Sequence, residues 1–137
     1  MRIVTDFIDE LKSRYGESLP FKRICEDQRI IIVEANLEPT NDGFCAKNSY
    51  HTVIVLNHNL THWERRDRAW HELWHAMKSP ATGINRREEA RANLFAALVR
   101  APVVKEGDTI DSLVEKYNVT RPLAKIRIEY ELRQING

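Results

Sequence analysis

The sequence predicts an α+β fold in which a small three-stranded sheet packs beside a helical layer. Short β-branched runs separated by turn residues occupy the segment between residues 30 and 56. Apolar residues at helical spacing precede that segment, and long helical patterns with capping residues follow it. Because the strands are grouped in one stretch, the helices should form their own layer and should not alternate with the strands.

The first half of the chain supplies one helix and the strands. A helix is expected over residues 2–15, and Gly16 ends it. The β-branched run Ile30–Val33 predicts a buried strand, because such residues favour strands. Two further strands are expected at Phe44–Lys47 and Thr52–Leu56, so the sheet should contain an antiparallel element.

Capping residues mark four helices in the second half. Thr61 with Glu64 fits a capping box before a helix over residues 63–78, which Ser79-Pro80 ends. Asn85 followed by Glu88 is a second start that resembles a capping box, with Asn in place of the usual Ser or Thr. The helix that begins there should end before Pro102. The last two helices are expected over 109–117 and 121–134, with these capping residues: Asp108, Asp111 and Thr120.

An H-E-x-x-H motif, His71-Glu72-Leu73-Trp74-His75, lies inside the helix predicted over residues 63–78. Residues four apart lie on the same helix face, so both imidazoles can bind one metal ion. Glu72 lies on the flank of that face, where it could take a proton from water without being a ligand. The alternative is two structural histidines hydrogen-bonded to neighbouring Arg and Glu side chains.

The same helix should bury one face and present ligands on another. At 100° per residue, the motif residues fall on one arc with Arg68 beside them. The apolar residues that fall on a different arc, and should face the core, are Trp63, Trp70, Leu73, Trp74 and Met77.

A catalytic zinc site usually has three protein ligands and a water, and the next helix offers candidates for the third. Glu88 fits the third position of the cap at Asn85, which already gives its carboxylate a structural task. Glu89 and Asn93 share another face of that helix. We therefore predict Glu89 as the third ligand and Asn93 as a hydrogen-bond partner of a ligating histidine. The alternative for Glu89 is a solvated carboxylate favoured by the helix dipole.

The other histidines and the cysteines lack the spacing of a metal site. His51, His58 and His62 are expected on the surface or in loops. Cys25 and Cys45 form no C-x-x-C pair, so we expect reduced thiols packed as small apolar groups.

With these motifs, the chain resembles a known family, the ImmA/IrrE metallopeptidases, over most of residues 28–134. The family pattern after the histidine motif resembles E-x-E-A-N-x-F-A-A-x-L-L-M-P. The matching segment here is Glu89-Ala90-Arg91-Ala92-Asn93-Leu94-Phe95-Ala96-Ala97, which ends at Ala101-Pro102. The other matching parts are Val53–Asn57, Arg65–Arg68, His71–His75 and Asp108–Arg127. Glu89 aligns with the first Glu of the pattern, Asn93 aligns with its Asn or Asp, and Arg91 replaces its second Glu.

The resemblance implies a zincin-like active-site helix and a zinc-dependent endopeptidase, with manganese or another divalent metal as an alternative to zinc. It implies a protein substrate, a helix-turn-helix repressor that cleavage inactivates, in the control of mobile elements or stress responses in bacteria or phages. Two positions depart from the family pattern. Trp74 replaces a usual Gly, so its ring either widens the core or narrows the cleft. The segment 98–102 also differs from the usual L-L-M-P ending.

Length and composition are consistent with one domain of 137 residues. We divide it into an N-terminal helix region (1–27), the sheet with the metal-binding helices (28–102) and C-terminal helices (103–137). No stretch approaches the roughly 20 apolar residues that cross a bilayer, and residues 1–15 lack the apolar core of a secretion signal. We therefore expect a cytoplasmic protein without a membrane partner.

The expected reaction is hydrolysis of a peptide bond. Glu72 would accept a proton from the attacking water and pass it to the leaving amine. The substrate would lie along an exposed strand, either Phe44–Lys47 or Thr52–Leu56, by β-addition.

The sequence leaves two other functions open. One is a non-catalytic regulatory or partner-binding protein on the same fold, with Trp74 occluding the site. The other is DNA binding, because residues 110–120 and the helix after them resemble a helix-turn-helix in outline. The net charge of +1 gives no support for nucleic-acid binding, and the apolar residues of these helices are explained by packing. Direct nucleic-acid binding is therefore not expected.

Overall fold

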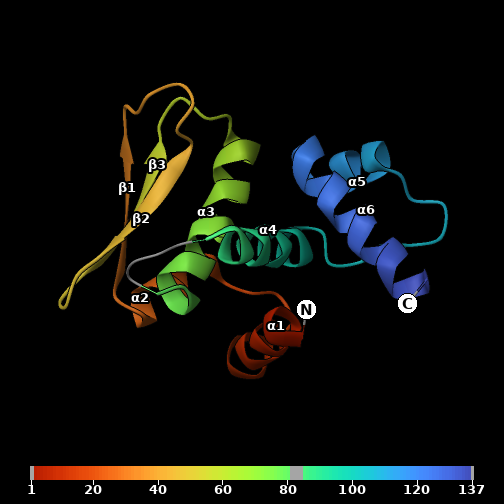
Figure 1. The fold of residues 1–137 in the computed structure, drawn as a ribbon, viewed down its shortest axis with the longest axis horizontal. Coiled ribbons are helices and arrows are strands. Elements are labelled where there is room, and N and C mark those ends of the chain that lie inside the picture. Colours follow the sequence, from red (N-terminus) through yellow and green to blue (C-terminus); the bar gives the residue numbers. More distant parts are fainter. Residues whose placement is uncertain (1, 81–84, 137) are drawn as a thin grey trace.

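The computed structural model describes residues 2–80 and 85–136, and it has the predicted α+β architecture (Figure 1). The described residues form six helices and a three-stranded sheet. The helices are α1 (Arg2–Tyr15), α2 (Phe21–Asp27), α3 (His62–Lys78), α4 (Arg86–Arg100), α5 (Ile110–Tyr117) and α6 (Arg121–Asn136). The strands are β1 (Ile30–Ala35), β2 (Gly43–Lys47) and β3 (Thr52–Asn57). In the described part of the chain, no helix has both the length and the apolarity needed to cross a membrane.

The sheet has the strand order β1-β3-β2, so the last strand of the sequence is the central one. β3 pairs in parallel with β1 and antiparallel with β2, which confirms the predicted antiparallel element. The prediction that the run Ile30–Val33 is buried is wrong, since Ile31 is 49% and Val33 40% exposed. The reason is that β1 is an edge strand and that α3 packs on the other two strands, β3 and β2.

The N-terminal region differs from the prediction by one helix. α1 ends as expected at Gly16, where a φ of +96° gives the left-handed conformation that glycine adopts without strain. The short helix α2 was not predicted. It has only seven residues, and only Ile24 and Cys25 among them are buried, so its sequence carries little helical periodicity.

The core lies where α1, α3 and α4 meet. Phe7, Trp74 and Phe95 form a cluster in which each pair of ring centroids is 5.6 Å apart. Trp70, Leu73 and Trp74 are buried as the helical periodicity predicts. Trp63 is not, because it lies in the first turn of α3, beyond the packed layer, and is 41% exposed. Met77 is only partly buried.

The helix caps agree with the sequence in two places and differ in two. The capping box of Thr61 and Glu64 is present, and the Asn85 side chain accepts a hydrogen bond from Glu88 N. The Glu88 carboxylate does not return to the cap as predicted, because it is used by a buried network described below. The predicted caps Asp108 and Asp111 are also wrong. The actual N-cap of α5 is Thr109, which forms a capping box with Ser112.

Buried charges attach the C-terminal helices to α3 and to the end of α4. Asp67 on α3 accepts hydrogen bonds from Arg100 Nε and from Thr120 N, both at 2.9 Å. Arg127 on α6 is also buried, and its guanidinium donates to the carbonyls of Ala101 and Pro102. The contacts of Asp67 hold the start of α6 against α3, and the Arg127 guanidinium holds α6 to the segment that follows α4.

Candidate metal centre

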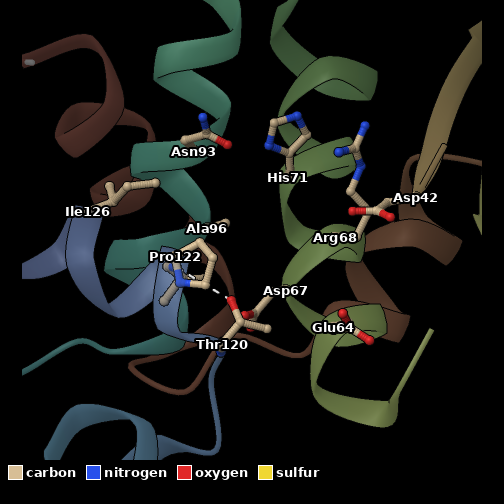
Figure 2. Close-up of a pocket in the computed structure, with 11 residues that line it drawn as sticks. Asp42, Glu64, Asp67, Arg68, His71, Asn93, Ala96, Thr120, Pro122 and Ile126 are labelled. Carbon is tan, nitrogen blue, oxygen red and sulfur yellow. Dashed lines mark hydrogen bonds between the residues drawn. The ribbon is translucent and has the colours of Figure 1, made fainter. Parts of the chain in front are cut away.

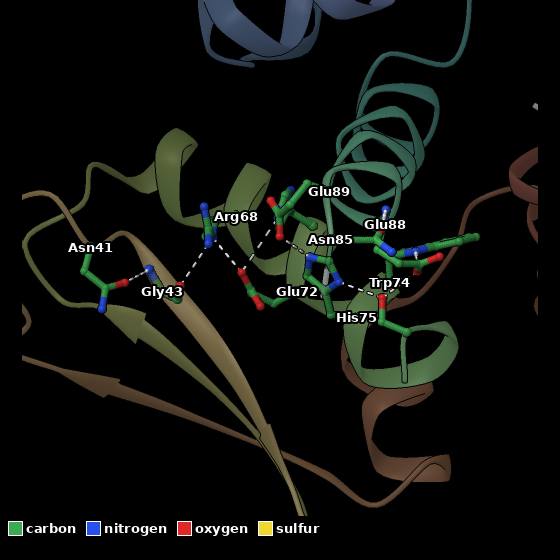
Figure 3. A network of polar contacts seen from close by, with 11 residues as sticks. Asn41, Gly43, Arg68, Glu72, Trp74, His75, Asn85, Glu88 and Glu89 are labelled. Carbon is green, nitrogen blue, oxygen red and sulfur yellow. Dashed lines mark hydrogen bonds and ion pairs between the residues drawn. The ribbon is translucent and has the colours of Figure 1, made fainter. Parts of the chain in front are cut away.

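α3 and α4 bring together the three residues predicted as metal ligands. Figure 3 shows two of them, His75 on α3 and Glu89 on α4, side by side. Nε2 of His71 lies 3.2 Å from one carboxylate oxygen of Glu89, and Nε2 of His75 lies 2.8 Å from the other. The two imidazole rings stand edge to face, with centroids 5.0 Å apart. The three candidate ligand atoms all lie within 4.8 Å of one another. The predicted triad is therefore one cluster, formed across the interface between the two helices.

The hydrogen bonds of His75 determine which ring nitrogen can bind a cation. Its Nδ1 lies 2.7 Å from Ser79 Oγ, and the Ser79 hydroxyl donates to Glu88 Oε2 at 2.8 Å. A hydroxyl has one proton, so Ser79 must accept the hydrogen of His75 Nδ1–H. In the neutral ring, Nε2 then carries no hydrogen, and its lone pair is directed at Glu89.

The Glu88 carboxylate is ionised in this arrangement. Burial alone would raise its pKa, but hydrogen bonds from Ser79, Trp74 and Arg91 outweigh burial and lower the pKa below its ordinary value. This network gives the buried Glu88 carboxylate its hydrogen-bond donors and gives the indole N–H of Trp74 an acceptor. The Trp74 ring lies in the core, and its Nε1–H donates to Glu88 Oε2 at 3.1 Å. Of the two alternatives for Trp74, the structure therefore shows packing in the core.

His71 is neutral at pH 7. Its burial, with help from the nearby Arg68, lowers its pKa to about 4. A neutral imidazole is the form that binds a metal. Asn93 faces His71 from α4 (Figure 2), and its side chain, as an acceptor for an imidazole N–H, is among the influences that raise the pKa of His71. The role of Asn93 as a hydrogen-bond partner of a ligating histidine stays a prediction.

The unsatisfied atoms of the cluster fit a divalent metal. Nε2 of His71 and Nε2 of His75 are buried and lack a hydrogen-bond partner among the described residues. Two imidazole nitrogens and a carboxylate this close together are a ligand set that can bind one divalent cation. Zinc binds nitrogen and oxygen at ~2.0–2.2 Å, which places tetrahedral ligand atoms about 3.3 Å apart. The Glu89 side chain is 46% exposed, so the cluster is open on one side, as a catalytic site requires.

Glu72 lies beside the cluster without belonging to it. Its Oε2 is 3.9 Å from His71 Nε2 and 2.7 Å from Arg68 Nε, and its side chain is almost fully buried. Burial raises the pKa of this carboxyl group, while Arg68 opposes the rise. A raised pKa brings a carboxylate closer to the range in which it can exchange protons near neutral pH.

Arg68 connects Glu72 to the sheet, a role that the sequence did not predict. Its Nη2 donates to the carbonyl of Gly43 on β2 at 2.9 Å (Figure 3). A Cβ at Gly43 would lie 2.6 Å from Val55 O and 3.4 Å from Arg68 Cγ, so only glycine fits there. The signal available in the sequence was the spacing of four residues between Arg68 and Glu72.

β2 is also attached to the end of α3. Nζ of Lys47 donates to the carbonyls of His75, Ala76 and Ser79 at the C-terminal end of α3. A cation at a helix C-terminus is favoured by the helix dipole. Lys47 and Ser79 are thus two residues near the metal centre that sequence analysis missed.

The remaining histidines and cysteines have the environments predicted for them. His51, His58 and His62 are exposed. Both cysteines are free thiols, Cys25 buried and Cys45 partly buried. Burial raises the pKa of Cys25 to about 12 and that of Cys45 to about 11, so both are unreactive as thiolates.

Comparison of the chain with protein-family models, with curated proteins and with solved structures finds no match in any of the three.

Proposed function

We propose that this protein is a zinc-dependent endopeptidase. The observation that carries the proposal is the pair of buried, unsatisfied Nε2 atoms of His71 and His75, which face the Glu89 carboxylate with Glu72 alongside. Two imidazoles and one carboxylate are the ligand set of several zinc hydrolases. The open side at Glu89 leaves room for water and substrate.

Each residue around the proposed metal has its own role in hydrolysis. A bound Zn²⁺ would act as a Lewis acid and lower the pKa of water in the site to about 7. Glu72 accepts the proton from the attacking water and returns it to the leaving amine. Arg68 holds the Glu72 carboxylate in place through its 2.7 Å contact. Ser79 and Glu88 keep His75 in the tautomer that presents Nε2.

Of the two strands predicted to bind the substrate, only β2 has a free edge in the described sheet. β3 pairs with strands on both sides, so its backbone cannot accept a further strand and Thr52–Leu56 is excluded. β2 lies at an edge, and no described strand pairs with its outer side. Its Gly43 end is joined to Glu72 through Arg68. We place the extended substrate along β2, by β-addition.

The substrate class comes from the resemblance to the ImmA/IrrE metallopeptidases. On that basis we propose that the protein cleaves a helix-turn-helix repressor at one site, within bacterial or phage regulation. The site geometry supports peptide hydrolysis in general, and the resemblance supplies the repressor.

The test is a comparison of wild type with Glu72→Gln, each loaded with zinc. Both should hold about one zinc per chain by elemental analysis, because Glu72 is not a ligand. The wild type should cleave peptides in a library made by digesting a bacterial proteome, and Glu72→Gln should cleave them ~10²–10⁴-fold more slowly. Glu10→Gln on the exposed face of α1 is the matched control. If wild type binds zinc but cleaves no peptide, the proposed peptidase activity is wrong and the non-catalytic regulatory function is favoured.

A further inference from the structure

A cavity of about 230 Å³ lies next to the metal centre, between α3 and the start of α6 (Figure 2). His71 and Asn93 line it at the end near the metal centre. Pockets that enclose a whole small-molecule ligand are typically ~300–1,000 Å³. This cavity, which we call the α3–α6 pocket, is smaller and suits a single side chain.

The two walls of the α3–α6 pocket have different chemistry. One wall is apolar and consists of Ala96, Pro122, Leu123 and Ile126. The other wall is formed by the charged residues Glu64, Asp67 and Arg68 of α3, together with Asp42 just before β2. A ligand that fits both walls has an apolar stem and a polar or charged end.

The charges that remain available in the pocket are negative. Asp67 is already neutralised by Arg100, with a further hydrogen bond from Thr120 N. Arg68 is paired with the buried Glu72.

The other two acids have no such partner. Within residues 2–80 and 85–136, neither Asp42 nor Glu64 forms an ion pair. The Glu64 carboxylate accepts only a backbone hydrogen bond, from Thr61 N at 2.9 Å. Two carboxylates without counter-ions beside an apolar wall match a lysine or arginine side chain, whose stem packs on apolar surface while its cation reaches the acids.

We infer that the α3–α6 pocket receives a side chain of the substrate next to the cleaved bond, and that Asp42 and Glu64 make it select lysine or arginine. This inference rests on the proposed peptidase function. It adds a preference that the metal centre alone does not provide, because Asp42 and Glu64 belong neither to the three proposed ligands nor to the proposed base Glu72.

The test uses two peptide hydroxamates that differ only in the side chain next to the hydroxamate, lysine in one and norleucine in the other. The hydroxamate binds zinc, and norleucine has the lysine stem without its charge. Affinity for the zinc-loaded full chain is measured by calorimetry, so the result does not depend on catalysis. We expect the lysine compound to bind about 5-fold tighter, as for two partly exposed ion pairs, with the ratio falling at high salt.

The double variant Asp42→Asn/Glu64→Gln should bring that ratio close to one. The matched control is Asp9→Asn/Glu10→Gln, which removes the same charge from the exposed face of α1 and should keep the ratio. Equal binding of the two compounds to wild type would overturn the inference, and so would a ratio that the double variant leaves unchanged.

The outcomes also separate the pocket from the proposed reaction. If the lysine compound binds tighter but no peptide is cleaved, the selectivity of the pocket is supported and the peptidase function is rejected. Cleavage of library peptides without enrichment of lysine or arginine beside the cut would keep the function and reject the pocket. If the chain holds no zinc, the metal centre fails and both proposals fail with it.

Discussion

Two buried carboxylates of this protein, Asp67 and Glu88, are each the centre of a polar network, and the networks differ in how they end. Asp67 receives hydrogen bonds from Arg100 and Thr120, and every member of that network has a protein partner. The network of Glu88 passes through Ser79 to His75, and there it ends at a ring nitrogen without a partner. Complete networks hold helices together, whereas an incomplete one marks a candidate binding site.

The largest effect on stability is expected where the complete network is broken. Asp67→Ala leaves the buried guanidinium of Arg100 without its counter-ion, which should lower the free energy of unfolding by ~3–5 kcal/mol. Urea denaturation of the metal-free protein measures this change. The control is Asp111→Ala, whose exposed pair with Arg121 should contribute less than ~1 kcal/mol. Similar losses in the two variants would show that the Asp67 network does not hold the helices.

A pH dependence of stability should arise from His71. Its pKa is about 4 in the folded metal-free protein and 6.5 when unfolded. Between these values the unfolded chain binds more protons, so stability falls as the pH falls from about 6.5 to 4, by roughly 3 kcal/mol from this residue. The raised pKa of Glu72 acts in the opposite direction, because the folded state then takes up that proton first.

The comparison of wild type with His71→Gln isolates the histidine contribution. The difference in unfolding free energy between the two proteins should shift in favour of the variant as the pH falls from 7 to 4. A difference that is constant over this range would contradict a buried neutral His71.

A smaller effect is expected where the incomplete network is shortened. Ser79→Ala removes the acceptor that orients His75, so zinc affinity should fall ~10–100-fold. Competition against a chelating dye measures the affinity. Ser49→Ala, in the turn between β2 and β3, should leave it unchanged. If Ser79→Ala binds zinc like wild type, Ser79 does not control the tautomer of His75.

The smallest effect on stability is expected at the open end of the site. Glu89→Ala should change the unfolding free energy of the metal-free protein by no more than ~0.5 kcal/mol, because the side chain is half exposed. Zinc should raise the melting temperature of wild type and of Glu10→Ala, but not that of Glu89→Ala. A variant that zinc still stabilises as strongly would remove Glu89 from the ligand set.

Most features that the sequence predicts correctly depend on residues within about one helical turn of each other. The capping box at Thr61, the end of α1 at Gly16 and the common face of His71 and His75 are of this kind. The burial of the run Ile30–Val33 was predicted wrongly from the same local information. A β-branched run indicates a strand, but its place at the centre or edge of a sheet depends on the other strands.

The sequence by itself therefore determined the α+β class, most of the helices and the residues that can act as ligands. Only the tertiary structure decided the strand order, the contact of Arg68 with Gly43 and the α3–α6 pocket. The physical reason is sequence separation. Arg68 is 25 residues from Gly43, and the Thr120 amide that completes the Asp67 network is 53 residues away. Contacts over such distances are set by how whole helices and strands pack, and no periodicity in a single segment specifies them.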